Sequence, residues 1–124
     1  MSADAEIVRV SLLDAALEGQ PEIGHVRCAR IDLAPEQAAG RHRHPCAVVG
    51  YVVAGTIRFQ VEGEGEQTLR AGDAFHEPAG APIAHFDNAS KHEPARFVAF
   101  YLLPPGEDRL IEMLGQDRDP PARP

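Results

Sequence analysis

His42 and His44 are the residues whose type and spacing point most directly to chemistry. One residue separates them, and side chains two positions apart in a β-strand project from the same face, so both imidazoles can reach one point. Imidazole is the commonest side-chain ligand of borderline divalent metals. The pair therefore supplies half of a metal ligand set. The alternative is a solvated loop, because histidines that alternate with arginines are often exposed.

His76 and Glu77 are candidate auxiliary residues, because they lie on an expected strand just before Pro78. Either one could act as a fourth ligand or as a general base. Strand parity allows only one of the two to point inward, and partly exposed strand residues are the alternative. His25 and His92 lie in or beside expected loops and are interpreted as surface residues.

Short strands must position these side chains. Eleven glycines and eleven prolines are spread along the chain and divide it into short pieces. The clearest strand is Thr56 to Val61, where apolar and polar residues alternate with a period of two. The other expected strands are Val48–Val53, Gln67–Arg70, Ala74–Glu77, Ile83–Phe86 and Ala95–Leu103, with weaker signals at Glu6–Leu13 and Gly24–Leu33.

Helix signals are few. Asp14 to Glu18 is expected to form at most one turn. Glu107 to Leu114 has apolar residues at helical spacing, which predicts a short C-terminal helix. The charged, proline-rich tail from Gln116 to Pro124 is expected to be flexible. We expect one all-β domain over residues 1–124, an antiparallel barrel or sandwich with its core at about 24–103.

The expected strands also suggest a pocket. Either the apolar residues of Thr56–Val61 or Arg58 and Gln60 face the interior, and the sequence leaves this choice open. If the apolar face is inward, the candidate pocket residues are Val48, Tyr51, Phe59 and Phe75, although ordinary core packing explains each of them equally well.

Charge and composition exclude several classes of partner. The formal net charge of -7, without a long basic cluster, disfavours nucleic acid and anionic membranes. No apolar stretch approaches the ~20 residues of a membrane helix, and the N-terminus lacks the pattern of a secretory signal. We therefore expect a cytoplasmic protein in which Cys28 and Cys46 remain free thiols.

Residues 40 to 88 resemble the two sequence motifs of the cupin superfamily. The first motif is matched by His42, His44 and the closing turn glycine Gly55. The second is matched by Gly72, Pro78 and Gly80 at the family's spacing. Several glycine, proline and histidine positions at set intervals are more specific than any one of them.

The sequence departs from the family at two ligand positions. Where the family has its glutamate ligand this chain has Val48, and where it has the histidine of the second motif this chain has Ile83. The nearest imidazole is His85, two residues later. An even shift keeps it on the same strand face, provided that no bulge intervenes.

The resemblance implies a double-stranded β-helix, also called a jelly roll or cupin barrel. It implies a homodimer and a divalent iron, manganese, nickel or zinc ion held by His42, His44 and His85. Because one fold hosts many functions, two hypotheses stay open. The first is a metalloenzyme resembling the dioxygenase cupins, acting on a chelating keto, enol or phenolic compound. The second is a non-catalytic cupin that binds or senses a small molecule and lacks the usual glutamate ligand.

Overall fold

The computed structural model describes residues 5–115, and this part of the chain folds into nine strands without a helix. The strands are β1 (His25–Leu33), β2 (His42–Arg43), β3 (Ala47–Ala54), β4 (Thr56–Val61), β5 (Gln67–Arg70), β6 (Ala74–Glu77), β7 (Ile83–Asn88), β8 (Ala95–Leu103) and β9 (Glu112–Met113). The predicted all-β fold is confirmed.

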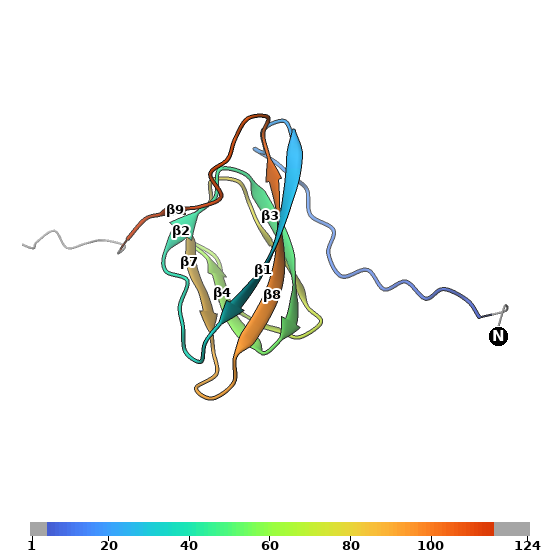
Figure 1. Cartoon of the computed structure of the whole chain (residues 1–124), viewed down its shortest axis with the longest axis vertical. Coiled ribbons are helices and arrows are strands. Elements are labelled where there is room, and N and C mark those ends of the chain that lie inside the picture. Colours follow the sequence, from blue (N-terminus) through green and yellow to red (C-terminus); the bar gives the residue numbers. More distant parts are fainter. Residues whose placement is uncertain (1–4, 116–124) are drawn as a thin grey trace, which may run out of the picture.

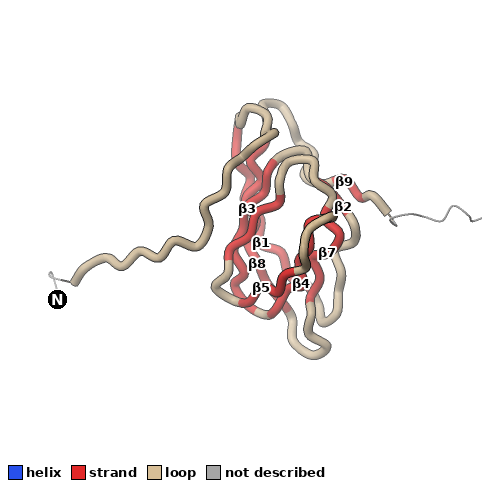
Figure 2. Tube along the Cα trace, turned by 180° about the vertical axis from the view of Figure 1, so that it is seen from behind, coloured by secondary structure: helices blue, strands red, loops and turns tan. Residues whose placement is uncertain are grey.

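Two antiparallel sheets face each other (Figure 1). One has the strand order β1-β8-β3-β6 and the other β5-β4-β7-β2-β9. Apart from the β4–β5 hairpin, neighbours in each sheet are not consecutive in the sequence, as in a jelly roll, where strands of one hairpin pair with strands of another. Figure 2 shows the same two layers from behind.

Most strands lie where the residue pattern predicts them. β4, β5, β6 and β8 have the predicted bounds, and β1, β3 and β7 differ by one or two residues at one or both ends. The sequence left open which face of β4 points inward. Ile57, Phe59 and Val61 are buried, so the apolar face does. Arg58 is exposed on the outer face of its sheet.

Two predicted elements are wrong. The stretch from Glu107 to Leu114 is extended, and its residues Glu112 and Met113 pair with β2 as β9. An ion pair of 2.9 Å between Arg43 and Glu112, and a backbone hydrogen bond from Leu114 to Arg41, outweigh the helical spacing of three apolar residues. The stretch from Glu6 to Leu13 is extended but pairs with no strand of the described chain. The predicted flexible tail, 116–124, lies outside the described residues.

Aromatic side chains fill the space between the sheets. Phe59, Phe75, Phe86 and Phe97 form a connected cluster with ring centroids 4.6 to 6.0 Å apart. A side chain on Gly50 would collide with the Phe75 ring, so glycine there lets the ring lie directly on β3.

β7 contains a β-bulge at the point where it passes the site. Gln60 of β4 pairs with His85, and the next residue, Val61, pairs with Ile83, so Ala84 is the extra residue. A bulge reverses the alternation of the strand on one side of it. Ile83 and Phe86, three residues apart, therefore both face the interior, where they are almost completely buried.

Among residues 5–115 no helix is long and apolar enough to cross a membrane. Cys28 is exposed and Cys46 is buried, and neither forms a disulfide.

Candidate metal centre

Two histidines and one carboxylate converge at one end of the sandwich. His42 lies on β2 of the five-stranded sheet, His44 follows immediately after β2, and Glu77 ends β6 of the four-stranded sheet. Each of the three offers a ligand atom, and these atoms lie within 4.8 Å of one another. All three side chains are buried. Such a cluster of buried titratable groups is the usual environment of a functional site.

Backbone carbonyls fix the orientation of both imidazole rings. The Nδ1 of His42 lies 2.6 Å from the carbonyl oxygen of Gly40, and the Nδ1 of His44 lies 2.6 Å from that of Leu110. A carbonyl oxygen only accepts hydrogen bonds, so each Nδ1 carries a proton. In the neutral ring the lone pair is then on Nε2, which is the arrangement of a metal-binding histidine.

Both Nε2 atoms face the same carboxylate oxygen. The Oε1 of Glu77 is 2.7 Å from the Nε2 of His44 and 3.6 Å from the Nε2 of His42. The same buried oxygen has no hydrogen-bond partner when the rings are neutral. Two acceptors at this distance repel each other unless a proton or a cation lies between them. The three residues therefore fit a divalent cation.

Without a metal, protons would supply that positive charge. Burial alone would raise the pKa of Glu77, but hydrogen bonds from His42 and His44 outweigh it and hold this pKa below its usual value. Burial alone would lower the pKa of His42, but the hydrogen bonds to Glu77 and to the Gly40 carbonyl raise it. A cation bound by the three side chains would replace the protons.

A cavity of about 160 Å³ opens beside the three residues. Among residues 5–115, Glu77 is the only acidic residue of its lining, and no lysine or arginine contributes. Its remaining walls come from β1, β3, β6, β8 and the loops beside β2 and β9, namely Ile31, Leu33, Ala39, Val48, Phe75, Phe97, Ala99, Tyr101 and Ile111.

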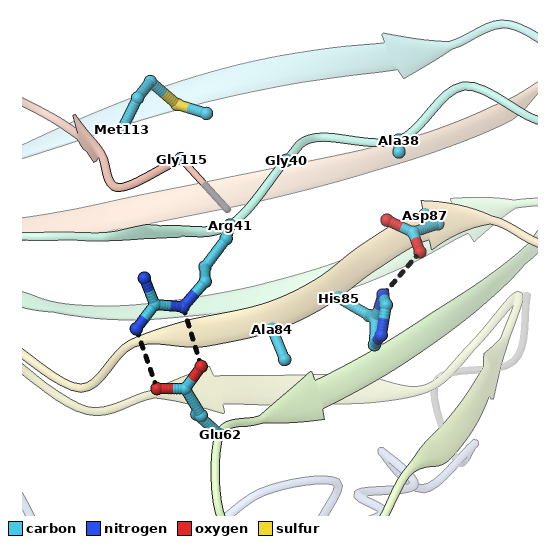
Figure 3. Close-up of a pocket in the computed structure, with 9 residues that line it drawn as sticks. All are labelled: Ala38, Gly40, Arg41, Glu62, Ala84, His85, Asp87, Met113 and Gly115. Carbon is cyan, nitrogen blue, oxygen red and sulfur yellow. Dashed lines mark hydrogen bonds and ion pairs between the residues drawn. The ribbon is translucent and has the colours of Figure 1, made fainter. Parts of the chain in front are cut away.

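His85 does not join this cluster, which corrects the prediction that it is the third ligand. The bulge at Ala84 turns it to the outer face of the five-stranded sheet, where its Nδ1 lies 3.0 Å from the Oδ2 of Asp87. It lines a separate, open pocket of about 540 Å³, in which Arg41 and Glu62 also form a bidentate ion pair (Figure 3). The family's own histidine position, Ile83, does face the interior, opposite His42.

The auxiliary candidates separate as strand parity requires. Glu77 faces the site, whereas His76 pairs with Val49 and faces the outside of its sheet. The partner of Glu77 on β3 is Val48, the residue at the family's glutamate position. The carboxylate that the first motif lacks is thus supplied by the adjacent strand.

The predicted pocket residues divide in the same way. Val48 and Phe75 line the cavity. Phe59 is buried in the aromatic cluster instead, and Tyr51 lies on the outer face, 42% exposed. Val48 and Tyr51 are three residues apart in a part of β3 whose pairing has no bulge, so they face opposite sides of the sheet.

Tyr101 was missed by the sequence analysis. Its ring packs edge to face on His44 with centroids 5.6 Å apart. Burial raises the pKa of its hydroxyl. The alternation of buried residues along β8 places Ala95, Phe97, Ala99 and Tyr101 on one face, and that pattern in the sequence could have indicated its position.

The chain resembles known proteins in sequence over its core and in structure over most of its length. Residues 29–101 match the cupin domain family. A comparison with curated proteins gives no match. Solved structures share its fold, including the DMSP lyase DddQ from Ruegeria pomeroyi DSS-3, with a TM-score of 0.60 and 18% identity over 71% of this chain and 42% of that one.

Two further structures have a TM-score of 0.59. An oxalate oxidase is 28% identical over 72% of this chain and 46% of its own. A cupin-like protein from Thermotoga maritima is 21% identical over 73% of this chain and 65% of its own. The chain therefore spans less than half the length of the lyase and the oxidase.

Proposed function

Because the chain belongs to the cupin family, we propose that His42, His44 and Glu77 bind a divalent metal ion and that the protein is a small-molecule metalloenzyme of the oxygenase type. The observation that carries the proposal is the buried Oε1 of Glu77, which faces two histidine Nε2 atoms and lacks a hydrogen-bond donor as long as both rings are neutral. This set of two histidines and one carboxylate is the donor set of non-haem iron(II) oxygenases. The oxalate oxidase that shares this fold, 28% identical to this chain, supports an enzymatic role.

The bound ion would supply Lewis-acid activation of a chelating substrate and, if it is iron, reactivity toward dioxygen. The protein would orient the ligands and bind the substrate. The carbonyls of Gly40 and Leu110 hold the two rings in place, so the ligand atoms need no reorganisation. Tyr101 lines the cavity and packs on His44, so its hydroxyl is the candidate hydrogen-bond donor to a substrate oxygen.

The cavity indicates the class of substrate. A volume of about 160 Å³ is well below the range of ~300 to 1,000 Å³ that is usual for drug-sized ligands. Among the described residues its lining is mostly apolar and includes no cationic side chain, so a dianion such as oxalate would find no positively charged partner besides the ion itself. We therefore propose a small keto, enol or phenolic compound that chelates at one end and is apolar at the other.

A second candidate is a binding or sensing protein without catalysis. Its support in the sequence is Val48 at the family's glutamate position. Because Glu77 presents a carboxylate from the adjacent strand, that support is weaker than the sequence alone suggests.

Elemental analysis of the purified chain and oxygen-consumption assays test both candidates. The metalloenzyme proposal predicts one divalent ion per chain and oxygen uptake with a panel of small ketones, enols and phenols. Both should be lost in His42→Ala, and both should persist in the control His85→Ala, because His85 lies on the outer face. A stoichiometric metal without turnover of any panel compound would favour the binding protein. A wild-type chain that takes up no metal would refute the metalloenzyme and leave the binding protein.

A further inference from the structure

A row of residues crosses the interior face of the four-stranded sheet at the end that holds the candidate metal centre. Glu77 of β6 pairs with Val48 of β3, and Val48 pairs with Tyr101 of β8. Tyr101 in turn pairs with Arg27 of β1. Residues that lie directly opposite each other on antiparallel strands project from the same face of the sheet. The row therefore begins at a candidate metal ligand and ends at an arginine on the edge strand.

Arg27 shares its face of β1 with residues that line the cavity. All nine residues of β1 pair with β8 without a register shift, so alternate residues lie on one face. Ala29, Ile31 and Leu33 follow Arg27 at steps of two, and they are the partly or fully buried residues of the strand. Ile31 and Leu33 line the cavity. Arg27 continues this face to the exposed end of the strand.

The mouth of the cavity lies beside the same strand. Among the described residues of the lining, Ile31, Ala39 and Ile111 are accessible to solvent, whereas the others are buried. They belong to β1, to the loop before β2 and to the connection between β8 and β9. This connection crosses from one sheet to the other at the end where β1 begins (Figure 1). A molecule that enters between these elements would therefore pass close to Arg27.

The guanidinium group of Arg27 has no partner among the described residues. Most arginines of the described chain form ion pairs with carboxylates, as Arg43 and Arg96 do. Arg27 is exposed and makes neither an ion pair nor a side-chain hydrogen bond with residues 5–115. A planar, permanently charged guanidinium can bind a carboxylate through two parallel hydrogen bonds. The row thus places beside the cavity a cation that the described lining does not contain.

The length of the row suits a small substrate. Its two ends are three strand spacings apart, about 14 Å between the Cα atoms of Glu77 and Arg27, and both side chains shorten this gap. A molecule that chelates an ion beside Glu77 and packs against Tyr101 would have its far end near Arg27.

We propose that Arg27 is a substrate-binding residue and that it binds a carboxylate at the mouth of the cavity. This inference rests on the proposed function and extends it. Beyond its chelating group and the apolar part that the cavity holds, the substrate carries a carboxylate that remains outside the cavity. The substrate is then a keto, enol or phenolic acid.

Binding of two matched catechols to the zinc-loaded protein tests this role. Protocatechuate has two hydroxyl groups that can chelate the ion and a carboxylate on the far side of its ring, and its carboxamide has the same shape without the charge. Titration calorimetry with the wild type should show that the acid binds about 5- to 20-fold more tightly than the amide, because a charge-assisted hydrogen bond replaces a neutral one. In Arg27→Gln this preference should disappear, while the zinc content and the affinity for the amide stay unchanged.

Arg30→Gln is the matched control. Arg30 lies on the same strand but on the opposite face, three residues from Arg27, so this variant should keep the wild-type preference. Equal affinity of the zinc-loaded wild type for the two compounds, binding of neither, or a preference that persists in Arg27→Gln would overturn the role of Arg27 and leave the metal centre intact. A wild type that binds no zinc would instead refute the metal centre, and this inference with it.

Discussion

Val48 on β3 lies directly opposite Glu77 on β6 in the four-stranded sheet. Adjacent strands place opposite Cβ atoms only about 4.5–5.5 Å apart. A glutamate at either position of this pair can therefore direct its carboxylate to the same two histidines. The relationship explains how the chain can keep a carboxylate in the site although the family's glutamate position holds a valine.

The first prediction exchanges the two residues of this pair. Glu77→Val should weaken metal binding by more than the ~10- to 100-fold that is typical of losing a group that only supports a ligand. The double variant Val48→Glu, Glu77→Val should recover most of the lost affinity, because its carboxylate again faces His42 and His44. Titration calorimetry with zinc or iron(II) measures both. If the double variant binds no better than the single one, the two positions are not equivalent.

The second prediction adds a ligand at Ile83. This residue is completely buried and pairs with His42. Ile83→His should therefore raise metal affinity, by roughly 10-fold or more, while lowering the free energy of unfolding of the metal-free protein by about 1–3 kcal/mol because a polar ring is buried without the ion. His85→Ala should change neither quantity. Chemical denaturation with and without metal separates the two effects.

The third prediction concerns pH. In the metal-free protein, the lowered pKa of Glu77 stabilises the fold above its unfolded value of 4.5, and this stabilisation is lost as the pH falls. The raised pKa of His42 stabilises the fold below its unfolded value of 6.5, and this is lost as the pH rises. The cluster should therefore stabilise the metal-free protein most between about pH 4.5 and 6.5.

Metal binding should show the opposite trend on the alkaline side, because His42, whose pKa is raised, must lose its extra proton before it binds. The difference in melting temperature between metal-loaded and metal-free protein should thus increase from pH 5 to pH 8. Glu77→Gln should flatten the metal-free profile. A profile that is the same in this variant would show that the cluster does not set the pH dependence.

The fourth prediction concerns Asn88, which connects three stretches of chain around the end of β7. Its side-chain amide donates to the carbonyls of Leu33, Ala34 and Glu93, and its oxygen accepts from the amide of Ser90. Asn88→Ala should lower the free energy of unfolding by about 2–4 kcal/mol, since it leaves buried backbone groups without partners. Asn88→Asp should lose the three donated bonds but keep the accepted one. Urea denaturation measures both variants.

The sequence predicted what depends on local pattern. The alternation in Thr56–Val61 defines β4, and the spacing of His42 and His44 is sufficient to place their rings together. Strand parity also predicted that only one of His76 and Glu77 points inward. What it left open was which of them faces inward, because that depends on the register of β6 against β3.

The errors have the same origin. His85 faces outward because one extra residue, Ala84, interrupts the pairing of β7 with β4, and no local signal marks it. The stretch around Glu112 is extended because β2, seventy positions earlier, offers it an edge and an ion pair through Arg43. Both depend on contacts between segments that are distant in the sequence.

The position of the candidate centre has a mechanical consequence. Glu77 belongs to one sheet of the sandwich and His42 to the other, so an ion bound by both would cross-link the two sheets beside the cavity. Removing the ion would leave the two sheets joined at this end by side-chain contacts and by the chain connections from β2 to β3 and from β6 to β7. The opening of the cavity entrance, and with it the entry of small molecules, would then depend on how tightly the ion is bound.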